Sequence, residues 1–391
     1  MMREENFNRQ NKKTNAAGRF WFPILVLVFL LCGSVSAEEG QAIPEIPGLH
    51  FVGQTEFRYA EEAEIYYYEE GFRLIDVKDS ARYLVVPEGK EVPEGTEDLV
   101  ILPEPKDSVY MAATAVMALF DAVDALDTIR FSSLTADGWY VDHARQAMED
   151  GRIVFAGKYS EPDYELLVRE NCSLAVESTM ILHTPRVQEM LENLGIPVLI
   201  DRSSYERHPL GRTEWVKVYG ALLGKEEEAE AFFADQSSVM EELHDFPNTG
   251  KTIAFFYMNT DGSVVVRRPD DYIPAMIGIA GGRYALDDME GLQKSARSSV
   301  SVTMEDFYMN ASDADVLVYN ASIEEPVHTV EDLLGKSSLF ADFKAVQEGN
   351  VWCTDRYLYQ ATDRSGDLIR DLHRILTGQD TENLTFLKKV Q

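Results

Sequence analysis

The chain of 391 residues is long enough for two domains with hydrophobic cores of their own. Its 45% hydrophobic and 26% charged residues are typical of a folded protein and exclude wholesale disorder. The 67 acidic residues against 36 basic ones give a formal net charge of −31, so we expect no nucleic-acid partner, because phosphate binding needs basic faces.

Residues 1–37 have the pattern of a signal peptide. Basic residues precede the apolar stretch "FWFPILVLVFLLCG", and "VSA" at 35–37 fits the small-residue cleavage rule. The apolar stretch is short for a membrane span. We therefore expect an exported protein, in the periplasm or at the outer cell surface, whose mature chain begins near Glu38.

The same leader leaves a second possibility open. "FLLCG" resembles a bacterial lipoprotein box, in which Cys32 would carry a lipid anchor. The box requires a small residue before the cysteine, and Leu31 departs from that pattern. Removal of the leader by simple cleavage and anchoring through Cys32 are both consistent with these residues.

Residues 38–105 predict a linker followed by a small β meander. Pro, Gly and Glu dominate 38–50, and "EIYYYEEGFRLIDV" then contains two strand-like runs about a Glu-Glu-Gly turn. "RYLVVPEG" and "DLVIL" supply further strands between Pro-Glu-Gly turns.

Residues 106–225 alternate between short apolar strands and helices, which favours a mostly parallel sheet covered on both faces. The clearest helix is "TPRVQEMLENLG", where Thr184 can cap the start, Pro185 suits the first turn and Gly195 suits the end. Two apolar stripes at helical spacing indicate helix faces turned toward the core. They are Val187, Met190, Leu191 and Leu194 in this helix, and Trp215, Val218, Tyr219 and Leu222 in "TEWVKVYGALLG".

A long helix is predicted at 226–246, and a second α/β lobe at 247–391. Apolar residues recur at helical spacing over 226–244, a length of roughly 28 Å, before Pro247 and Gly250 end the helix. The expected fold class is α/β: two Rossmann-like lobes joined by one long linking helix, with a small N-terminal β meander.

Enzyme signatures are absent from the sequence. There is no Gly-x-Ser-x-Gly elbow, no His-Glu-x-x-His and no phosphate-binding Gly-x-x-x-x-Gly-Lys loop, so we expect neither catalytic residues nor a cofactor. The seven histidines are dispersed, and the spacing of Cys172 and Cys353 matches no metal site. We predict no metal site and two buried free thiols.

The layout resembles the helix-linked class of bacterial ABC-transporter substrate-binding proteins, which serve ferric siderophores, haem and cobalamin. The resemblance covers about 108–378 and depends on the order of four stretches. These are "SEPDYELLVRENCSLAVES", "LENLGIPVLIDRSS", "GALLGKEEEAEAFF" and "MIGIAGGRYALDD". It implies a monomer that captures an iron chelate, haem or corrinoid in the interlobe cleft and delivers it to the permease of an ABC importer.

The resemblance also implies docking residues. In this family a glutamate on each lobe contacts arginines of the permease, and Glu165 in "PDYELL" matches the first-lobe position. Arg283 occupies the second-lobe position and departs from the pattern. Asp287, Asp288 or Glu290 could take over that contact.

Ligands of open α/β sheets bind beyond the carboxyl ends of the strands, so the residues that follow each strand are candidates. These segments are rich in aromatic and basic residues, which suit multi-ring ligands and carboxylates. The candidate ligand-binding residues are Thr114, Trp139, Tyr140, Lys158, Tyr159, Glu177, Arg202, His208, Tyr257, Arg267, Asn320 and Tyr359. Arg267 and Arg268 alternate on a strand, so we expect only one of them to face the cleft.

The stretch "DRSSYERHPLGR", residues 201–212, gathers cationic side chains after the strand "IPVLI". These side chains could hold an anionic chelate, or they could neutralise neighbouring acids and tie the loop to the linking helix. We expect Arg202 and His208 to face the ligand and Arg212 to support the helix entry.

Three other functions stay open. A metal-ion carrier would need clustered His, Asp or Glu ligands in the cleft. An exported α/β enzyme would need a site assembled in space. A surface interaction module would use the β meander as its contact.

Overall fold

A computed structural model of the chain describes residues 43–104, 107–294 and 298–391. The predicted signal peptide, Cys32 and the expected mature start at Glu38 lie outside these residues. The chain divides into residues 1–43 and a compact unit, Pro44–Gln391, which contains the helices and strands of the fold. Within the described ranges, no helix combines the length and apolar character that crossing a membrane requires.

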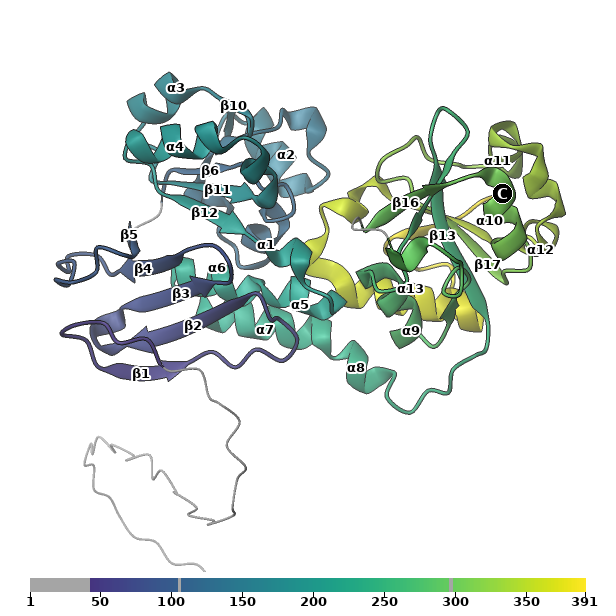
Figure 1. Cartoon of the computed structure of the whole chain (residues 1–391), viewed down its shortest axis with the longest axis horizontal. Helices are drawn as coiled ribbons and strands as arrows, with labels where there is room; N and C mark the ends of the chain where they lie inside the picture. Colours follow the sequence, from purple (N-terminus) through teal and green to yellow (C-terminus); the bar gives the residue numbers. More distant parts are fainter. Residues whose placement is uncertain (1–42, 105–106, 295–297) are drawn as a thin grey trace, which may run out of the picture. The chain divides into compact units, whose positions relative to one another are not determined.

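A five-stranded sheet, here called the N-terminal sheet (residues 44–104), precedes the first lobe (Figure 1). Its strands are β1 (Phe51–Gln54), β2 (Ala63–Tyr68), β3 (Arg73–Val77), β4 (Arg82–Val86) and β5 (Val100–Pro103). Strands β1 to β4 pair antiparallel in sequence order, as a meander does. β5 instead runs parallel to β4, so the segment between them crosses over rather than turning back.

Both faces of the N-terminal sheet are covered. Ile65, Ile75 and Val85 on one face belong to the main core of the molecule, next to α6 (Val216–Leu223). Tyr66 and Leu74 on the other face belong to a smaller apolar cluster. Because α6 has this sheet on one side and the first lobe on the other, it is buried nearly all round.

The first lobe is built on a five-stranded sheet in the order β12-β11-β6-β7-β8, with every pair parallel, as predicted. The strands are β6 (Val109–Met111), β7 (Ile129–Ser132), β8 (Val154–Phe155), β11 (Leu174–Ser178) and β12 (Val198–Asp201). The helices are α1 (Met117–Ala122), α2 (Asp142–Glu149), α3 (Tyr164–Arg169) and α4 (Pro185–Asn193). A small hairpin, β9 (Gly157–Lys158) with β10 (Glu161–Pro162), follows β8.

Helix α4 begins and ends where the sequence indicated, but two details differ. Thr184 is the N-cap residue without a capping side chain, because its hydroxyl donates to the carbonyl of Ile181 instead. Met190 and Leu194 are 46% and 41% exposed, so only half of the predicted stripe is buried.

Four consecutive helices lead from the first lobe to the second: α5 (Pro209–Glu214), α6, α7 (Glu226–Ser237) and α8 (Val239–Glu242). The single linking helix expected over 226–246 is therefore two helices that meet at Ser238. The Ser238 hydroxyl donates to the carbonyl oxygen of Asp235 at 2.7 Å, a back-bond that competes with the helical ladder.

The second lobe has a mixed sheet in the order β16-β14-β13-β17-β18-β19, with β15 paired to one end of β13. The strands are β13 (Thr252–Met258), β14 (Val264–Arg267), β15 (Arg283–Tyr284), β16 (Ser299–Val302), β17 (Val316–Tyr319), β18 (Val351–Thr354) and β19 (Leu387–Lys389). The helices are α9 (Tyr272–Ile279), α10 (Met304–Ala311), α11 (Val330–Lys336), α12 (Lys344–Gln347) and α13 (Ser365–Thr377).

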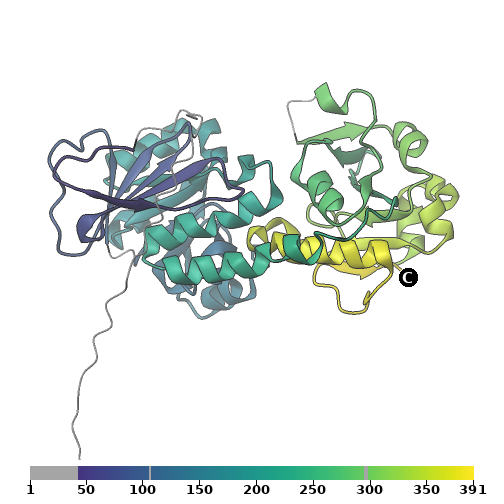
Figure 2. The ribbon, with the colours of Figure 1, turned by 90° about the horizontal axis from the view of Figure 1, so that it is seen from below.

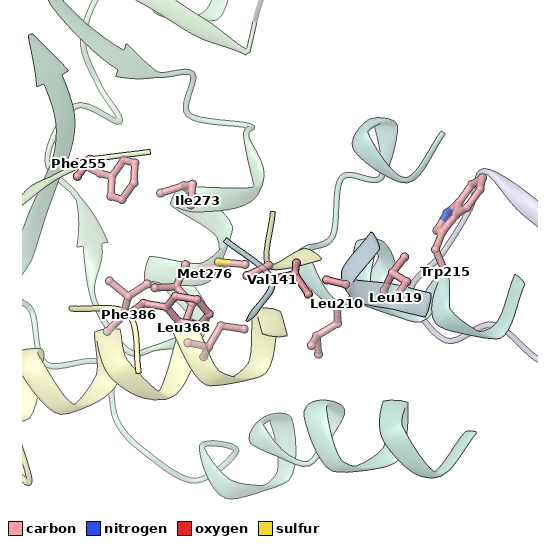
Figure 3. Packing of buried hydrophobic residues seen from close by; sticks show 14 of the residues in the cluster. Leu119, Val141, Leu210, Trp215, Phe255, Ile273, Met276, Leu368 and Phe386 are labelled. Atoms are coloured by element: carbon pink, nitrogen blue, oxygen red, sulfur yellow. The ribbon is translucent and has the colours of Figure 1, made fainter. Parts of the chain in front are cut away.

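The two lobes share one hydrophobic core. Leu119 and Leu210 belong to the same buried cluster as Met276 and Leu368 of the second lobe (Figure 3). The last helix, α13, packs against α5, α7, α8 and α9, and Figure 2 shows it beside the linking helices. The lobes are thus joined by buried packing as well as by the chain.

Candidate functional site: a cleft between the lobes

A cavity of about 480 Å³ lies between the two lobes. The turn after β12 and the start of α5 form one wall, and the turn between β14 and α9 forms the other. The lining residues are Ser204, Tyr205, Glu206, Arg207 and Arg212 from the first lobe, and Arg267, Arg268, Asp270, Asp271, Tyr272, Ser298 and Tyr359 from the second.

Two arginines from different lobes converge on one aromatic ring of this cavity. The guanidinium carbon of Arg212 lies 4.1 Å from the centre of the Tyr272 ring, and that of Arg267 lies 5.6 Å from it. Cation–π contacts of this kind hold positive charge beside an aromatic surface. The cavity therefore presents guanidinium groups from both walls.

The carboxylates of the cavity compensate this charge only in part. Arg268 donates through Nε to Asp270 at 2.7 Å and holds the pKa of that carboxyl below its usual range. Burial raises the pKa of Asp271, while Arg267, 3.8 Å away, opposes the shift. The described lining thus holds four arginines against three carboxylates, Glu206, Asp270 and Asp271, within a chain that is strongly acidic overall.

Both Arg267 and Arg268 line the cavity, which corrects the expectation that only one would face it. The alternation of a strand no longer applies, because β14 ends at Arg267. The chain then turns, and the Asp271 side chain accepts from the amide of Ile273 to begin α9.

Aromatic side chains supply the remaining walls. Tyr205 is 52% exposed and Tyr359 is 38% exposed. The ring of Tyr359 meets that of Tyr140 edge to face, with 6.1 Å between the ring centres. Tyr140 itself lines a neighbouring cavity of about 570 Å³ together with Arg356 and Lys388.

A buried glutamine fixes this aromatic pair across the lobes. Gln360 Nε2 donates to the carbonyl of Gly138 at 2.9 Å and to the Tyr359 hydroxyl at 2.7 Å, and its Oε1 accepts from the amide of Tyr140 at 2.8 Å. The bonds to Gly138 and Tyr140 connect the segment after β18 to the loop after β7, and the bond to Tyr359 holds the neighbouring ring in place.

In the stretch 201–212, Arg207 and Arg212 line the cavity, whereas Arg202 and His208, which were expected to face the ligand, are not among its described lining residues. Arg202 is only 8% exposed, and its Nε and Nη2 donate to Glu62 of the N-terminal sheet at 2.9 and 2.8 Å. His208 stacks on the ring of Tyr59, with 4.3 Å between ring centres, and burial lowers its pKa. The residues that reach the cleft are Arg207, which is exposed, and Arg212.

The position at which β12 ends explains why Arg202 is buried and Arg207 is not. Asp201 is the last residue of the strand, so Arg202 still lies at the level of the buried sheet, under the loop of the N-terminal sheet. A 3-10 turn at Ser203–Tyr205 then carries the chain outward, and the next side chains become available to the cleft.

Three other candidates are buried and are not among the described lining residues of the cavity. Trp139 has no exposed surface, and its Nε1 donates to Ser132 Oγ at 2.9 Å. Asn320 is 2% exposed and its Oδ1 accepts from the amide of Ser322. Glu177 points from β11 into the apolar face of the first lobe, where burial raises its pKa to about 8.

The remaining candidates lie elsewhere on the surface of the lobes. Thr114, Tyr159 and Tyr257 are half-buried, and Lys158 is exposed. Of the twelve candidates, Arg267 and Tyr359 are among the described lining residues of the cleft cavity.

Sequence reasoning missed or set aside most of the site. Tyr205, Arg207, Asp270, Asp271 and Tyr272 were not singled out, and Arg212, which was expected to support the helix entry, also lines the cavity. The available signal was their position directly after a strand.

Docking, thiol and metal expectations fall on described residues. Glu165 is exposed in the first turn of α3, and Arg283, Asp287, Asp288 and Glu290 are exposed on the second lobe. Cys172 and Cys353 are buried free thiols, as predicted. Across the part of the chain that the structure describes, no group of three or more His, Cys, Asp or Glu is placed to hold a metal ion.

Comparison with known proteins agrees with this architecture. A family model described as periplasmic binding protein matches residues 115–358. Two relatives are uncharacterized lipoproteins of Methanocaldococcus jannaschii. One is 27% identical over 246 residues, 61% of this chain and 56% of the relative, and the other is 24% identical over 357 residues, 87% of this chain and 88% of the relative. The chain thus spans about half of the first relative and most of the second.

Solved structures share the fold at low identity. A periplasmic binding protein of Veillonella parvula has a TM-score of 0.57 at 14% identity, covering 70% of this chain and 92% of that one. A periplasmic haem-binding protein of Pseudomonas aeruginosa has a TM-score of 0.56 at 14% identity, covering 73% and 98%. The vitamin B12-binding protein BtuF of Vibrio cholerae has a TM-score of 0.50 at 16% identity, covering 70% and 97%.

The family model covers well over half of the chain, and the two α/β lobes with their parallel strands have the fold of these structures. The chain belongs to the periplasmic binding protein family.

Proposed function

We propose that this protein is an exported solute-binding protein that captures an anionic iron chelate, haem or corrinoid in the interlobe cleft and delivers it to an ABC importer. The observation that carries the proposal is the convergence of four arginines with three tyrosines on one cavity between the lobes. Guanidinium groups match carboxylate geometry, and aromatic rings suit flat, multi-ring ligands.

The dimensions and chemistry of the cavity support this class of ligand. Its volume of about 480 Å³ falls in the usual range of small-molecule sites, and its opposite walls come from different lobes. The structural neighbours include a haem-binding and a vitamin B12-binding protein. A metal-ion carrier is less well supported, because the described residues offer no cluster of metal ligands.

Delivery and anchoring belong to the same proposal. The exposed Glu165 on α3 would contact the permease, with a second contact from Asp287, Asp288 or Glu290. The names of the two relatives as lipoproteins favour anchoring through Cys32 over simple removal of the leader.

A melting-temperature screen of the mature protein tests the ligand class. Haemin, cobalamins and ferric siderophores are compared with amino acids and sugars, because a ligand that binds only the folded state raises the melting temperature. We expect at least one member of the first group to stabilise the protein at saturation. Stabilisation by amino acids or sugars alone would contradict the proposal.

A further inference from the structure

The loop between β1 and β2 of the N-terminal sheet is bound by two carboxylates of the first lobe. Glu214 accepts from the backbone amides of residues 58–60 at 2.8 to 3.1 Å. Glu206 accepts from those of residues 61–62 at 2.8 and 2.9 Å. Five consecutive N–H groups are thus satisfied by two carboxylates that are 0% and 4% exposed.

Side chains strengthen the same contact. Glu62 receives the guanidinium of Arg202, which in turn lies 4.4 Å from the centre of the Tyr205 ring. Gly211 allows the closest approach, because a Cβ at this position would lie 2.8 Å from the carbonyl oxygen of Tyr59. The loop and the segment 202–214 therefore fit against each other without room for a methyl group.

The segment bound in this way is also the first-lobe wall of the cleft. Tyr205, Glu206, Arg207 and Arg212 all line the cavity, and all lie between or beside residues that hold the N-terminal sheet. The N-terminal sheet precedes residue 115, where the match to the family model begins. The support of this wall thus comes from a part of the chain outside that match.

We propose that the N-terminal sheet is a positioning element for the cleft, with Glu62 as the residue that orients Tyr205 through Arg202. The side chains of Glu62 and Arg202 are only 13% and 10% exposed, so the charge of Arg202 depends on Glu62 for compensation. Asp79, 3.7 Å from Arg202, is 77% exposed and is a weaker partner. Loss of the Glu62 carboxylate lets Arg202 move, and Tyr205 moves with it.

The first test needs no ligand. Amide hydrogen exchange is compared between the wild type, Glu62→Gln and a matched control, Glu104→Gln, which breaks the Arg73–Glu104 ion pair of the same sheet. We expect amides of residues 202–208 to exchange about threefold or more faster in Glu62→Gln and to be unchanged in the control. Equal exchange in all three proteins would overturn the proposal.

The second test rests on the proposed function and uses haemin and cyanocobalamin as probes. We expect Glu62→Gln to lower the affinity for the probe that the wild type binds by about five- to twentyfold. This is less than the roughly ten- to hundredfold of a lost direct charge-assisted contact, because Glu62 acts only through Arg202 and Tyr205. In a Tyr205→Ala background the same substitution should change affinity by less than about twofold, because the tyrosine ring through which Glu62 acts on the cleft is already absent. If Glu62→Gln lowers the probe affinity by the same factor in both backgrounds, the role of Glu62 is merely structural and the proposal is overturned.

The two tests separate the two proposals. If the wild type binds neither probe, the ligand assignment is wrong for these compounds, while hydrogen exchange still decides whether the sheet positions the loop. If exchange rises in Glu62→Gln and a bound probe keeps its affinity, the sheet does not set the geometry of the cleft, and the inference fails although the function stands.

Discussion

Glu177 gives the chain a stability that depends on pH. Its side chain has no exposed surface, and neither carboxylate oxygen has a hydrogen-bond partner among the described residues. Burial in the apolar face of the first lobe raises its pKa from an ordinary 4.5 to about 8. The folded protein therefore keeps a proton on this group at neutral pH, whereas the unfolded chain releases it.

The sign and size of the effect follow from this difference. Because the pKa of Glu177 is higher in the folded state, this group lowers the free energy of unfolding as pH rises. The destabilisation is small below pH 4.5, grows with pH and reaches its full size above pH 8. One pKa unit corresponds to about 1.4 kcal/mol, so Glu177 destabilises the fold by roughly 1 kcal/mol at pH 5 and by about 4 kcal/mol at pH 8. Glu177→Gln keeps the size of the side chain and removes the titration.

Urea unfolding of the wild type and Glu177→Gln at pH 5 and pH 8, followed by tryptophan fluorescence, measures the difference. We expect the gain in stability from the substitution to be about 3 kcal/mol larger at pH 8 than at pH 5. Glu165→Gln, which changes an exposed carboxylate of the same lobe, is the control and should show no such change. The same gain at both pH values would refute the reasoning.

Three further outcomes are expected. Thiol titration of the denatured, unreduced mature protein should find both Cys172 and Cys353, and a count of zero would contradict their free state. Gly366→Ala should destabilise the fold by about 1–3 kcal/mol in urea, because its Cβ would lie 2.2 Å from a backbone oxygen of α7. Gly335→Ala, with open space around it, should not. Glu165→Arg should lower stimulation of the importer without lowering the affinity for the ligand. Loss of ligand binding together with normal stimulation would exclude a docking role.

The fold was largely accessible from local patterns. Strand–helix alternation predicts the parallel sheet of the first lobe, and the stripe through Trp215 and Tyr219 predicts the buried face of α6. The burial of the opposite face of α6 was not predictable in this way, because the covering N-terminal sheet is more than a hundred residues away in the sequence. The parallel placement of β5 likewise depends on tertiary packing.

The site was predictable as a region and not as a set of side chains. Position after a strand directs attention to the stretch 201–212, of which residues 204–207 and 212 line the cavity. The same rule cannot tell Arg202 from Arg207, since the partner that withdraws Arg202 from the cleft is Glu62, 140 residues earlier. Charge compensation between distant segments thus decides which of these arginines lines the cavity.

Calorimetric titration of the mature protein with the most stabilising compound of the melting screen, alongside Arg207→Ala, tests the cleft most directly. Arg207 lines the cavity and is exposed, so its removal should leave the melting temperature of the empty protein unchanged. Arg186→Ala, which removes an exposed arginine of α4, is the matched control. The account predicts one binding site per chain. Its affinity for the ligand should fall about ten- to a hundredfold in Arg207→Ala and stay unchanged in Arg186→Ala. Equal affinity in all three proteins would show that the ligand binds outside this cleft.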